Sequence, residues 1–184
     1  MKIKFVSRTE NPIDVIAKGA GTSYGKEDAS EKRVISCFKS GHMGVFEHAC
    51  LTVRIEGISR ACSHQLVRHR LASFVQQSQR YCRIDVDSDD WYVKPKVFDG
   101  IDHRVIDEPE WFDCMMRDAA RAYNEALEFG IKPEDARYLL PEATKTNITM
   151  TVNVRELYHF LDMRTDKAAQ WEIRWLSTRG PKSG

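Results

Sequence analysis

The chain has 184 residues, of which 42% are hydrophobic and 30% charged, and its formal net charge is +1. These values are typical of a folded protein and predict one domain over residues 1–184. The balanced charge argues against a broad basic surface for nucleic acid or an anionic membrane, so any anion site must be local. No apolar stretch approaches the ~20 residues of a membrane helix, and the N-terminal residues lack the apolar segment of a secretory signal. We therefore expect a cytoplasmic protein that binds neither nucleic acid nor membrane.

The cysteines are odd in number, widely spaced and without a Cys-x-x-Cys pair. This spacing argues against a disulfide framework and against a zinc site, and we expect no metal. We expect reduced and mostly buried thiols at all five positions: Cys37, Cys50, Cys62, Cys82 and Cys114.

Residues 28–41 predict a helix, with a capping box formed by Asp28 and Glu31 and a C-terminal stop at Gly41. Apolar and polar residues then alternate over 51–56, as in a half-buried strand. Ser59 is placed to cap a helix that extends to about residue 70.

The following stretch leaves that helix through Ser73 towards an extended segment near Tyr81. Residues 85–113 hold ten acidic and three basic side chains, which predicts a solvated acidic loop inserted over 85–108. The start of this stretch resembles a calcium-binding loop, but Asp90 stands where glycine is required and Lys96 where glutamate is required. We therefore expect no calcium site there.

A long helix is predicted over 109–129, with Gly130 as its stop. Its predicted core or interface stripe is apolar: Trp111, Met115, Ala119, Ala122, Ala126 and Phe129. The remaining elements are a short helix between Pro133 and Pro141, a strand over 147–153, and helices over 154–162 and 166–177. Because these elements show no βαβ rhythm, we predict an α+β fold with a mixed or antiparallel sheet.

The stretch GAGTSYGK at 19–26 suggests a phosphate-binding loop but does not satisfy the known patterns. Ala20 and Glu27 break the Walker pattern, and Tyr24 replaces the third glycine of the dinucleotide fingerprint. Ser23 can still offer a hydroxyl group to an anion.

The segment RHRLASFVQQSQR at 68–80 is unusually rich in hydrogen-bond donors. On a continuous helix Gln65, Arg68 and His69 share one face, whereas Arg70 points about 200° away from Arg68. Planar guanidinium groups suit phosphate and carboxylate. This arrangement favours two anionic ligands, or one ligand shared with another chain, and places the segment at a subunit boundary.

A second group of donors follows later in the chain, without an obvious acidic nucleophile or metal cluster. It consists of Arg137, Asn153, Arg155, His159 and Arg164.

The block RHRLASFVQQSQRY at 68–81 resembles the signature of flavin-dependent thymidylate synthases (ThyX), in which Arg-His-Arg is followed after seven residues by Ser. Four further blocks resemble the same family in the same order: SYGK (23–26), GHMGVFEH (41–48), ARYLLP (136–141) and TVNVRELYHFLDMRTDKAAQWEIR (151–174). The resemblance therefore extends over most of the chain.

This resemblance implies a ThyX-like α+β homotetramer whose active sites are shared between chains. It implies an enzyme that binds FAD and methylates dUMP to dTMP, with methylenetetrahydrofolate as carbon donor and NADPH as reductant. Arg164 is the implied catalytic residue, which polarises the uracil. The implied dUMP contacts are Gln65, Arg68, Gln76, Ser78, Arg80, Arg137 and Arg164. The implied flavin contacts are Ser23, Arg68, His69, Arg70, Gln76, Asn153, Arg155 and His159.

The chain departs from the family pattern at two places. Gly44 and Val45 replace a hydroxyl residue and a proline, which removes one side-chain contact to FAD. Val75 and Gln76 replace Asn-Glu, so a carboxylate near both ligands becomes a neutral amide. His42 and His48 either border the folate or nicotinamide site or are structural.

Two alternatives stay open at this point. One is a nucleic-acid-binding module that uses the arginines at 68, 70, 80 and 155, with Tyr81 or Tyr158 as stacking platforms. The other is a ThyX-like protein that binds nucleotide and flavin without turnover.

Overall fold

The computed structural model describes residues 1–95 and 108–180. The chain forms two compact units, and each draws on separate stretches of sequence. The first unit comprises Met1–Glu56, His64–Val75 and the chain from Ile148 onwards; the second comprises Gly57–Ser63 and Gln76–Asn147. That these units act as a single catalytic domain over 1–184 stays a prediction.

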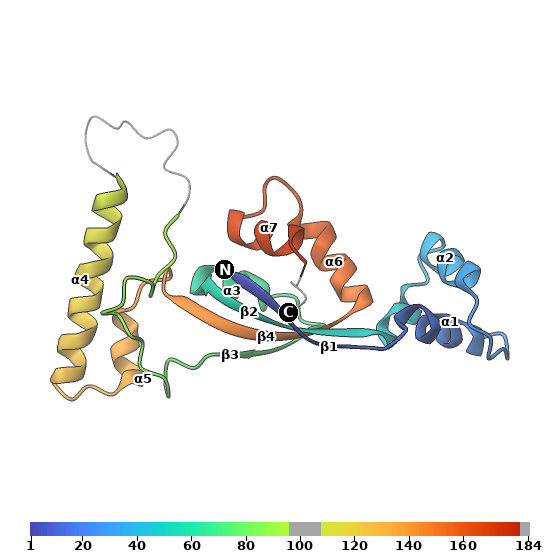
Figure 1. Ribbon diagram of the computed structural model, residues 1–184, viewed down its shortest axis with the longest axis horizontal. Coiled ribbons are helices and arrows are strands. Elements are labelled where there is room, and N and C mark those ends of the chain that lie inside the picture. The colour runs from blue at the N-terminus through green and yellow to red at the C-terminus, as the bar shows by residue number, and fades with distance from the viewer. Residues whose placement is uncertain (96–107, 181–184) are drawn as a thin grey trace. The chain divides into compact units, whose positions relative to one another are not determined.

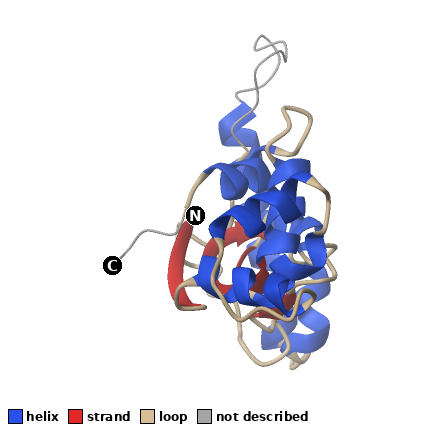
Figure 2. Cartoon of the chain, turned by 90° about the vertical axis from the view of Figure 1, so that its right-hand side faces the viewer, coloured by secondary structure: helices blue, strands red, loops and turns tan. Residues whose placement is uncertain are grey.

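Helices, blue in Figure 2, make up more of the described chain than strands, which are red. The α-helices are α1 (Pro12–Thr22), α2 (Glu31–Lys39), α3 (Arg60–Leu66), α4 (Glu108–Glu128), α5 (Pro133–Ala136), α6 (Val154–Arg164) and α7 (Trp171–Thr178). Two short 3-10 helices are η1 (Met43–His48) and η2 (Arg137–Leu139). The strands are β1 (Lys2–Arg8), β2 (Cys50–Ser59), β3 (Ser73–Gln76) and β4 (Lys145–Asn153).

The four strands form one sheet in the order β1-β2-β4-β3. Strand β1 pairs antiparallel with β2, from Lys2 opposite Glu56 to Arg8 opposite Leu51. The sheet and its helices confirm the predicted α+β class (Figure 1). Strand β1 was not predicted from the sequence, and the extended segment expected near Tyr81 lies earlier, at β3.

Alternation identified the two long strands correctly. In β4 every second residue is buried, from Thr146 through Ile148 and Met150 to Val152. In β2 the inward positions Val53 and Ile55 are buried as well. These side chains turn one face of each strand into core, which is the pattern that a half-buried sheet requires.

In the first unit, α1 packs against α2 and η1, around a small core that includes Ile16, Phe46 and Ala49. The predicted stop at Gly41 is confirmed by its positive φ of 71°. The predicted capping box is wrong, because the Asp28 carboxylate binds the guanidinium of Arg33 instead. Helices α6 and α7 lie side by side (Figure 1).

In the second unit, α4 confirms the predicted long helix and ends before Gly130, whose φ is 82°. The predicted apolar stripe is partly wrong as a core stripe, while its role as an interface stays a prediction. Met116 and Tyr123 are buried, whereas Trp111, Met115 and Phe129 are exposed. The helix is therefore rotated by about one residue from the expected face.

The acidic stretch also differs from its prediction. Val86 and Trp91 are buried in the core of the second unit, so residues 85–95 are not simply a solvated loop. The rest of the predicted insertion, up to residue 107, lies outside the described residues. Helix α7 starts later than expected because Gln170 caps it by accepting from the backbone N–H groups of Glu172 and Ile173.

The five cysteines are free, as predicted, but only Cys62 is fully buried; Cys50 and Cys82 are exposed. Among the described residues, no helix is both long enough and apolar enough to span a membrane.

Candidate functional site

The Arg-His-Arg segment is not helical. Ser59 caps α3 by accepting from the backbone N–H of Cys62, as predicted, but the helix ends at Leu66. Two turns follow, closed by hydrogen bonds from His69 N to Leu66 O and from Ala72 N to His69 O. The predicted shared helical face of Gln65, Arg68 and His69 is therefore wrong, as is the subunit-boundary argument built on it. In the turns His69 points inward and is buried, while Arg68 and Arg70 are exposed.

Helix α6 supplies the other half of this site. Asn153 ends β4 and caps α6, because its Oδ1 accepts from the backbone N–H of Glu156 over 2.9 Å. The helix then presents Arg155, Glu156 and His159, and it ends at Arg164. Because β4 leads directly into this capped helix, the start of α6 is fixed, and with it the positions of these side chains along the helix.

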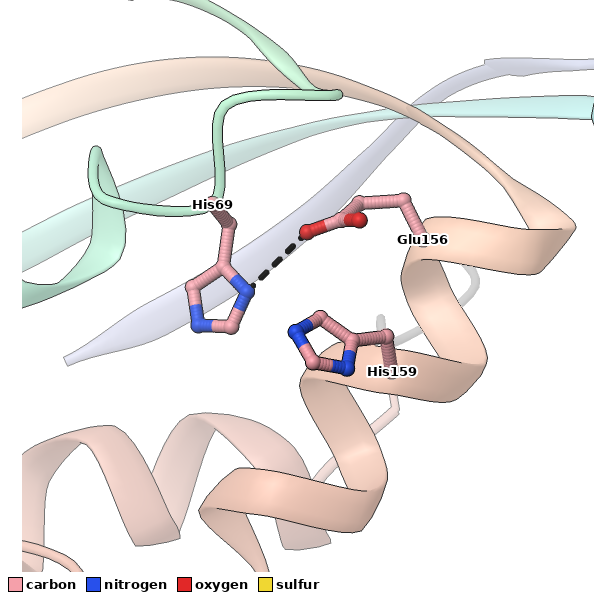
Figure 3. A group of neighbouring side chains, drawn as sticks. All are labelled: His69, Glu156 and His159. Atoms are coloured by element: carbon pink, nitrogen blue, oxygen red, sulfur yellow. Dashed lines mark hydrogen bonds and ion pairs between the residues drawn. The ribbon is translucent and has the colours of Figure 1, made fainter.

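His69 joins the turn to α6 through both of its ring nitrogens. Its Nδ1 lies 3.1 Å from Oε1 of Glu156, and its Nε2 accepts from Nε of Arg164 over 3.2 Å. The dashed line in Figure 3 marks the contact with Glu156. His69 and Glu156 are both only 4% exposed. The ring of Phe160 packs edge-on against the imidazole.

Burial is the main cause that lowers the pKa of His69, and the positive charge of Arg164 lowers it further, while the hydrogen bond to Glu156 raises it. A lowered pKa keeps the imidazole neutral at pH 7. With one proton on the ring, Nδ1–H donates to Glu156 and the Nε2 lone pair accepts from Arg164.

A cavity of about 880 Å³ opens beside this cluster. Its walls carry four guanidinium groups, from Arg68, Arg70, Arg155 and Arg164. Apolar side chains complete it: Met43, Leu71, Tyr158 and Met163. Several fixed cations beside an apolar wall suit a ligand that combines phosphate groups with a ring system.

The ligand atoms of His69, Glu156 and His159 lie within 4.8 Å of one another, as in many metal sites (Figure 3). However, Nε2 of His69 already faces the Arg164 guanidinium. A permanent positive charge at that distance opposes a metal cation, so we assign none here.

In the second unit, two predicted substrate contacts, Arg80 and Arg137, bind Glu134. Nε of Arg80 lies 2.6 Å from Oε2 of Glu134, and Nε of Arg137 donates to the Glu134 carbonyl. Ser78 accepts from the backbone N–H of Arg80. Gln76, also in this unit, donates from Nε2 to Ser63 and Thr146.

Ser23 is not among the residues that line the arginine cavity. It lines another hollow of the first unit, of about 650 Å³, together with His42, Gly44 and His48. A side chain at Gly19 would place its Cβ 2.9 Å from the His48 ring, so glycine keeps this wall open. Gln65 lies in α3 and is not among the residues that line the arginine cavity.

Sequence reasoning missed Glu156, Glu47 and Arg60. Glu156 precedes the predicted site residue His159 by three positions and therefore lies on the same side of α6. This spacing was the sequence signal that could have identified Glu156. Glu47 forms an ion pair with Arg155. Arg60, in the second unit, is partly buried close to Glu142 and Arg137, and burial lowers its pKa.

The fold and this cavity define an α+β protein with an arginine-rich cavity. The profile of a family described as "Thymidylate synthase complementing protein" matches residues 4–179. Flavin-dependent thymidylate synthases of Thermococcus onnurineus and Geobacter sulfurreducens are 39% and 40% identical to the chain. These alignments cover 95% and 96% of the chain, and 74% and 79% of the two relatives.

A solved structure of the ThyX protein from Helicobacter pylori, complexed with FAD and dUMP, has the same fold with a TM-score of 0.78. The two sequences are 23% identical. The match covers 97% of this chain and 91% of the Helicobacter pylori chain. The chain therefore belongs to the family of flavin-dependent thymidylate synthases.

Proposed function

We propose that this protein converts dUMP to dTMP with FAD as cofactor, methylenetetrahydrofolate as carbon donor and NADPH as reductant. The observation that carries the proposal is the cavity in which the Arg-His-Arg turn and α6 present four arginines. Family membership over residues 4–179 supplies the reaction class.

The residues at this cavity fit a flavin dinucleotide. Arg68, Arg70 and Arg155 offer planar donors for a pyrophosphate, and Tyr158 with Met163 offers an apolar surface for a ring. When bound, FAD supplies the hydride transfer that turns the transferred one-carbon unit into a methyl group. His159 lines the same cavity and lies close to this surface.

Arg164 is the proposed catalytic residue. None of the five cysteines is among the residues that line the cavity, so another means of activating uracil is needed. A guanidinium group beside the N3–C4–O4 edge stabilises the negative charge that develops on the ring as C5 becomes nucleophilic. One such donor typically contributes about 3–4 kcal/mol to the transition state.

The remaining proposed dUMP contacts divide into two sets. Gln65 and Arg68 lie in the first unit. The side-chain amide of Gln65 can form hydrogen bonds with the edge of the uracil ring. Ser78, Arg80 and Arg137 lie in the second unit and are proposed phosphate contacts. Arg80 and Arg137 bind Glu134, and Ser78 accepts from the backbone N–H of Arg80. The Gln76 amide nitrogen is engaged with Ser63 and Thr146, which leaves its oxygen as the atom proposed to face the ligands.

We also propose a homotetramer with shared active sites. Large apolar side chains are exposed on the single chain, among them Phe129 at 83%, Tyr138 at 82% and Val75 at 76%. Exposed apolar side chains of this size favour an interface in which they are buried against other copies of the same chain. Sedimentation of the purified protein tests the number of subunits. The expected cytoplasmic location stays a prediction.

The decisive experiment is purification followed by an optical spectrum and an assay. We expect a visible flavin spectrum, FAD on release, and dTMP only when dUMP, methylenetetrahydrofolate and NADPH are all present. A protein that binds FAD and dUMP but forms no dTMP would replace the proposal with a binder that lacks turnover. A colourless protein that binds single-stranded nucleic acid, with strong salt dependence, would overturn it altogether.

A further inference from the structure

Among the described residues, one hydrogen bond holds the Arg164 side chain. Among residues 1–95 and 108–180, its guanidinium has one hydrogen bond, from Nε to Nε2 of His69. Its backbone is fixed separately, because Ser177 on α7 donates to the Arg164 carbonyl. The contact with His69 therefore decides where the two terminal NH₂ groups point.

That contact depends on the proton position in His69. Nε2 can accept from Arg164 only when the ring is neutral and its proton is on Nδ1. The Glu156 carboxylate, 3.1 Å from Nδ1, can only accept while it is ionised, and therefore selects this tautomer. Glu156 is itself placed by the Asn153 cap at the start of α6.

We propose that Glu156 and His69 are positioning residues that orient the Arg164 guanidinium towards the cavity. The inference rests on the proposed function for the role of Arg164, but the proton position is a property of the protein alone. His69 then acts through Arg164 and not as a direct ring contact to the flavin.

The ring itself offers a test without substrate. Histidines are labelled with ¹⁵N, and the ring signals of the six histidines are compared with those of His69→Gln to find His69. At pH 7 we expect a neutral ring with its proton on Nδ1, and in Glu156→Leu a loss of this preference. A proton on Nε2, or a charged imidazole, would overturn the proposal whether or not the protein forms dTMP.

Kinetics test the consequence for Arg164. His69→Leu removes the acceptor at nearly constant size, whereas His69→Gln keeps a side-chain oxygen that can accept from Arg164. We expect kcat to fall up to about 100-fold in His69→Leu, as for a misplaced catalytic group, with a much smaller change in KM for dUMP. His69→Gln should recover part of the loss.

A double-mutant cycle separates positioning from general structural damage. Arg164→Lys keeps the charge but lacks the Nε–H that binds His69. If His69 acts through Arg164, then His69→Leu adds less than about threefold to the loss of kcat in the Arg164→Lys background. Independent, multiplying losses would contradict the proposal.

Thermal unfolding of each variant identifies those that fail to fold. If His69→Leu fails to fold, a cycle that combines His69→Gln with Arg164→Lys replaces it, and the ¹⁵N spectrum of the wild type still decides the proton position. Absence of dTMP formation by the wild type, with the expected tautomer present, would defeat the proposed function and not the positioning pair.

Discussion

Gln76 and Gln77, adjacent in the chain, use their side-chain amides in opposite senses. The Nε2 of Gln76 donates to Ser63 over 2.8 Å and to Thr146 over 3.1 Å. The Oε1 of Gln77 instead accepts from the amide of Asn147 over 2.9 Å. One residue is therefore a donor and its neighbour an acceptor, in the same part of the second unit.

This difference predicts that replacement by glutamate destabilises the protein at position 76 but is tolerated at position 77. Gln76→Glu loses both donated bonds, and Ser63 already donates its own proton to the Arg60 carbonyl. We expect a cost of about 1–3 kcal/mol in the free energy of unfolding at pH 7. Gln77→Glu keeps an acceptor and should cost less than about 1 kcal/mol. Urea denaturation measures both; equal losses would mean that the amide assignment is reversed.

The elements that were predicted correctly have a local cause. In β4 the alternation of residues coincides with alternating burial, and in α4 the helix ends where Gly130 takes a positive φ. Strand β1 was missed because all its residues but one are exposed, so its sequence carries no pattern of burial.

The end of α3 has a distant cause. The sequence from Ser59 to Arg70 is compatible with a longer helix, but His69 turns inward to reach Glu156, 87 positions further along the chain. Local propensity cannot reveal such a partner. Family resemblance identified Arg164 and the other arginines of the cavity, yet it did not identify Glu156, whose partner became visible only in three dimensions.

Buried His69 should make stability depend on pH. Its pKa is lowered in the folded chain, mainly by burial, so the unfolded chain takes up the proton more readily. The groups that face its ring are Glu156, Arg164 and His159. Stability is therefore fully present above the ordinary pKa of 6.5 and falls as the pH drops through the lowered value.

Thermal unfolding between pH 8 and 5 measures this loss. The slope below pH 6.5 should be shallower in His69→Gln than in the wild type, whereas exposed His42→Gln should leave the slope unchanged. Identical slopes in all three proteins would show that His69 does not titrate differently on folding.

Arg164 should contribute to chemistry more than to binding. Arg164→Ala is expected to lower kcat about 100- to 1000-fold, because one donor to the developing charge is lost. The KM for dUMP should change less than about fivefold. Arg54→Ala, an exposed arginine of β2 that pairs with Glu56, is the control and should change neither value. A large rise in KM with constant kcat would assign Arg164 to binding alone.

Arg80 should contribute mainly to the binding of dUMP. As a phosphate contact it forms a charge-assisted bond, so Arg80→Ala is expected to raise KM about 10- to 100-fold with little change in kcat. In the structure its Nε is 2.6 Å from Glu134, whose carboxylate competes with phosphate for the same guanidinium.

Removing the negative charge of Glu134 should strengthen the binding of dUMP. The Arg80 side chain is 57% exposed, and an exposed ion pair contributes at most about 1 kcal/mol, or about fivefold in affinity. Glu134→Gln should therefore lower KM for dUMP by up to about fivefold, and 0.5 M salt should reduce this gain. Asp118→Asn breaks a comparable exposed pair with Arg121 on α4 and should leave KM unchanged. If Glu134→Gln raises KM instead, Glu134 holds Arg80 in its binding position and does not compete for it.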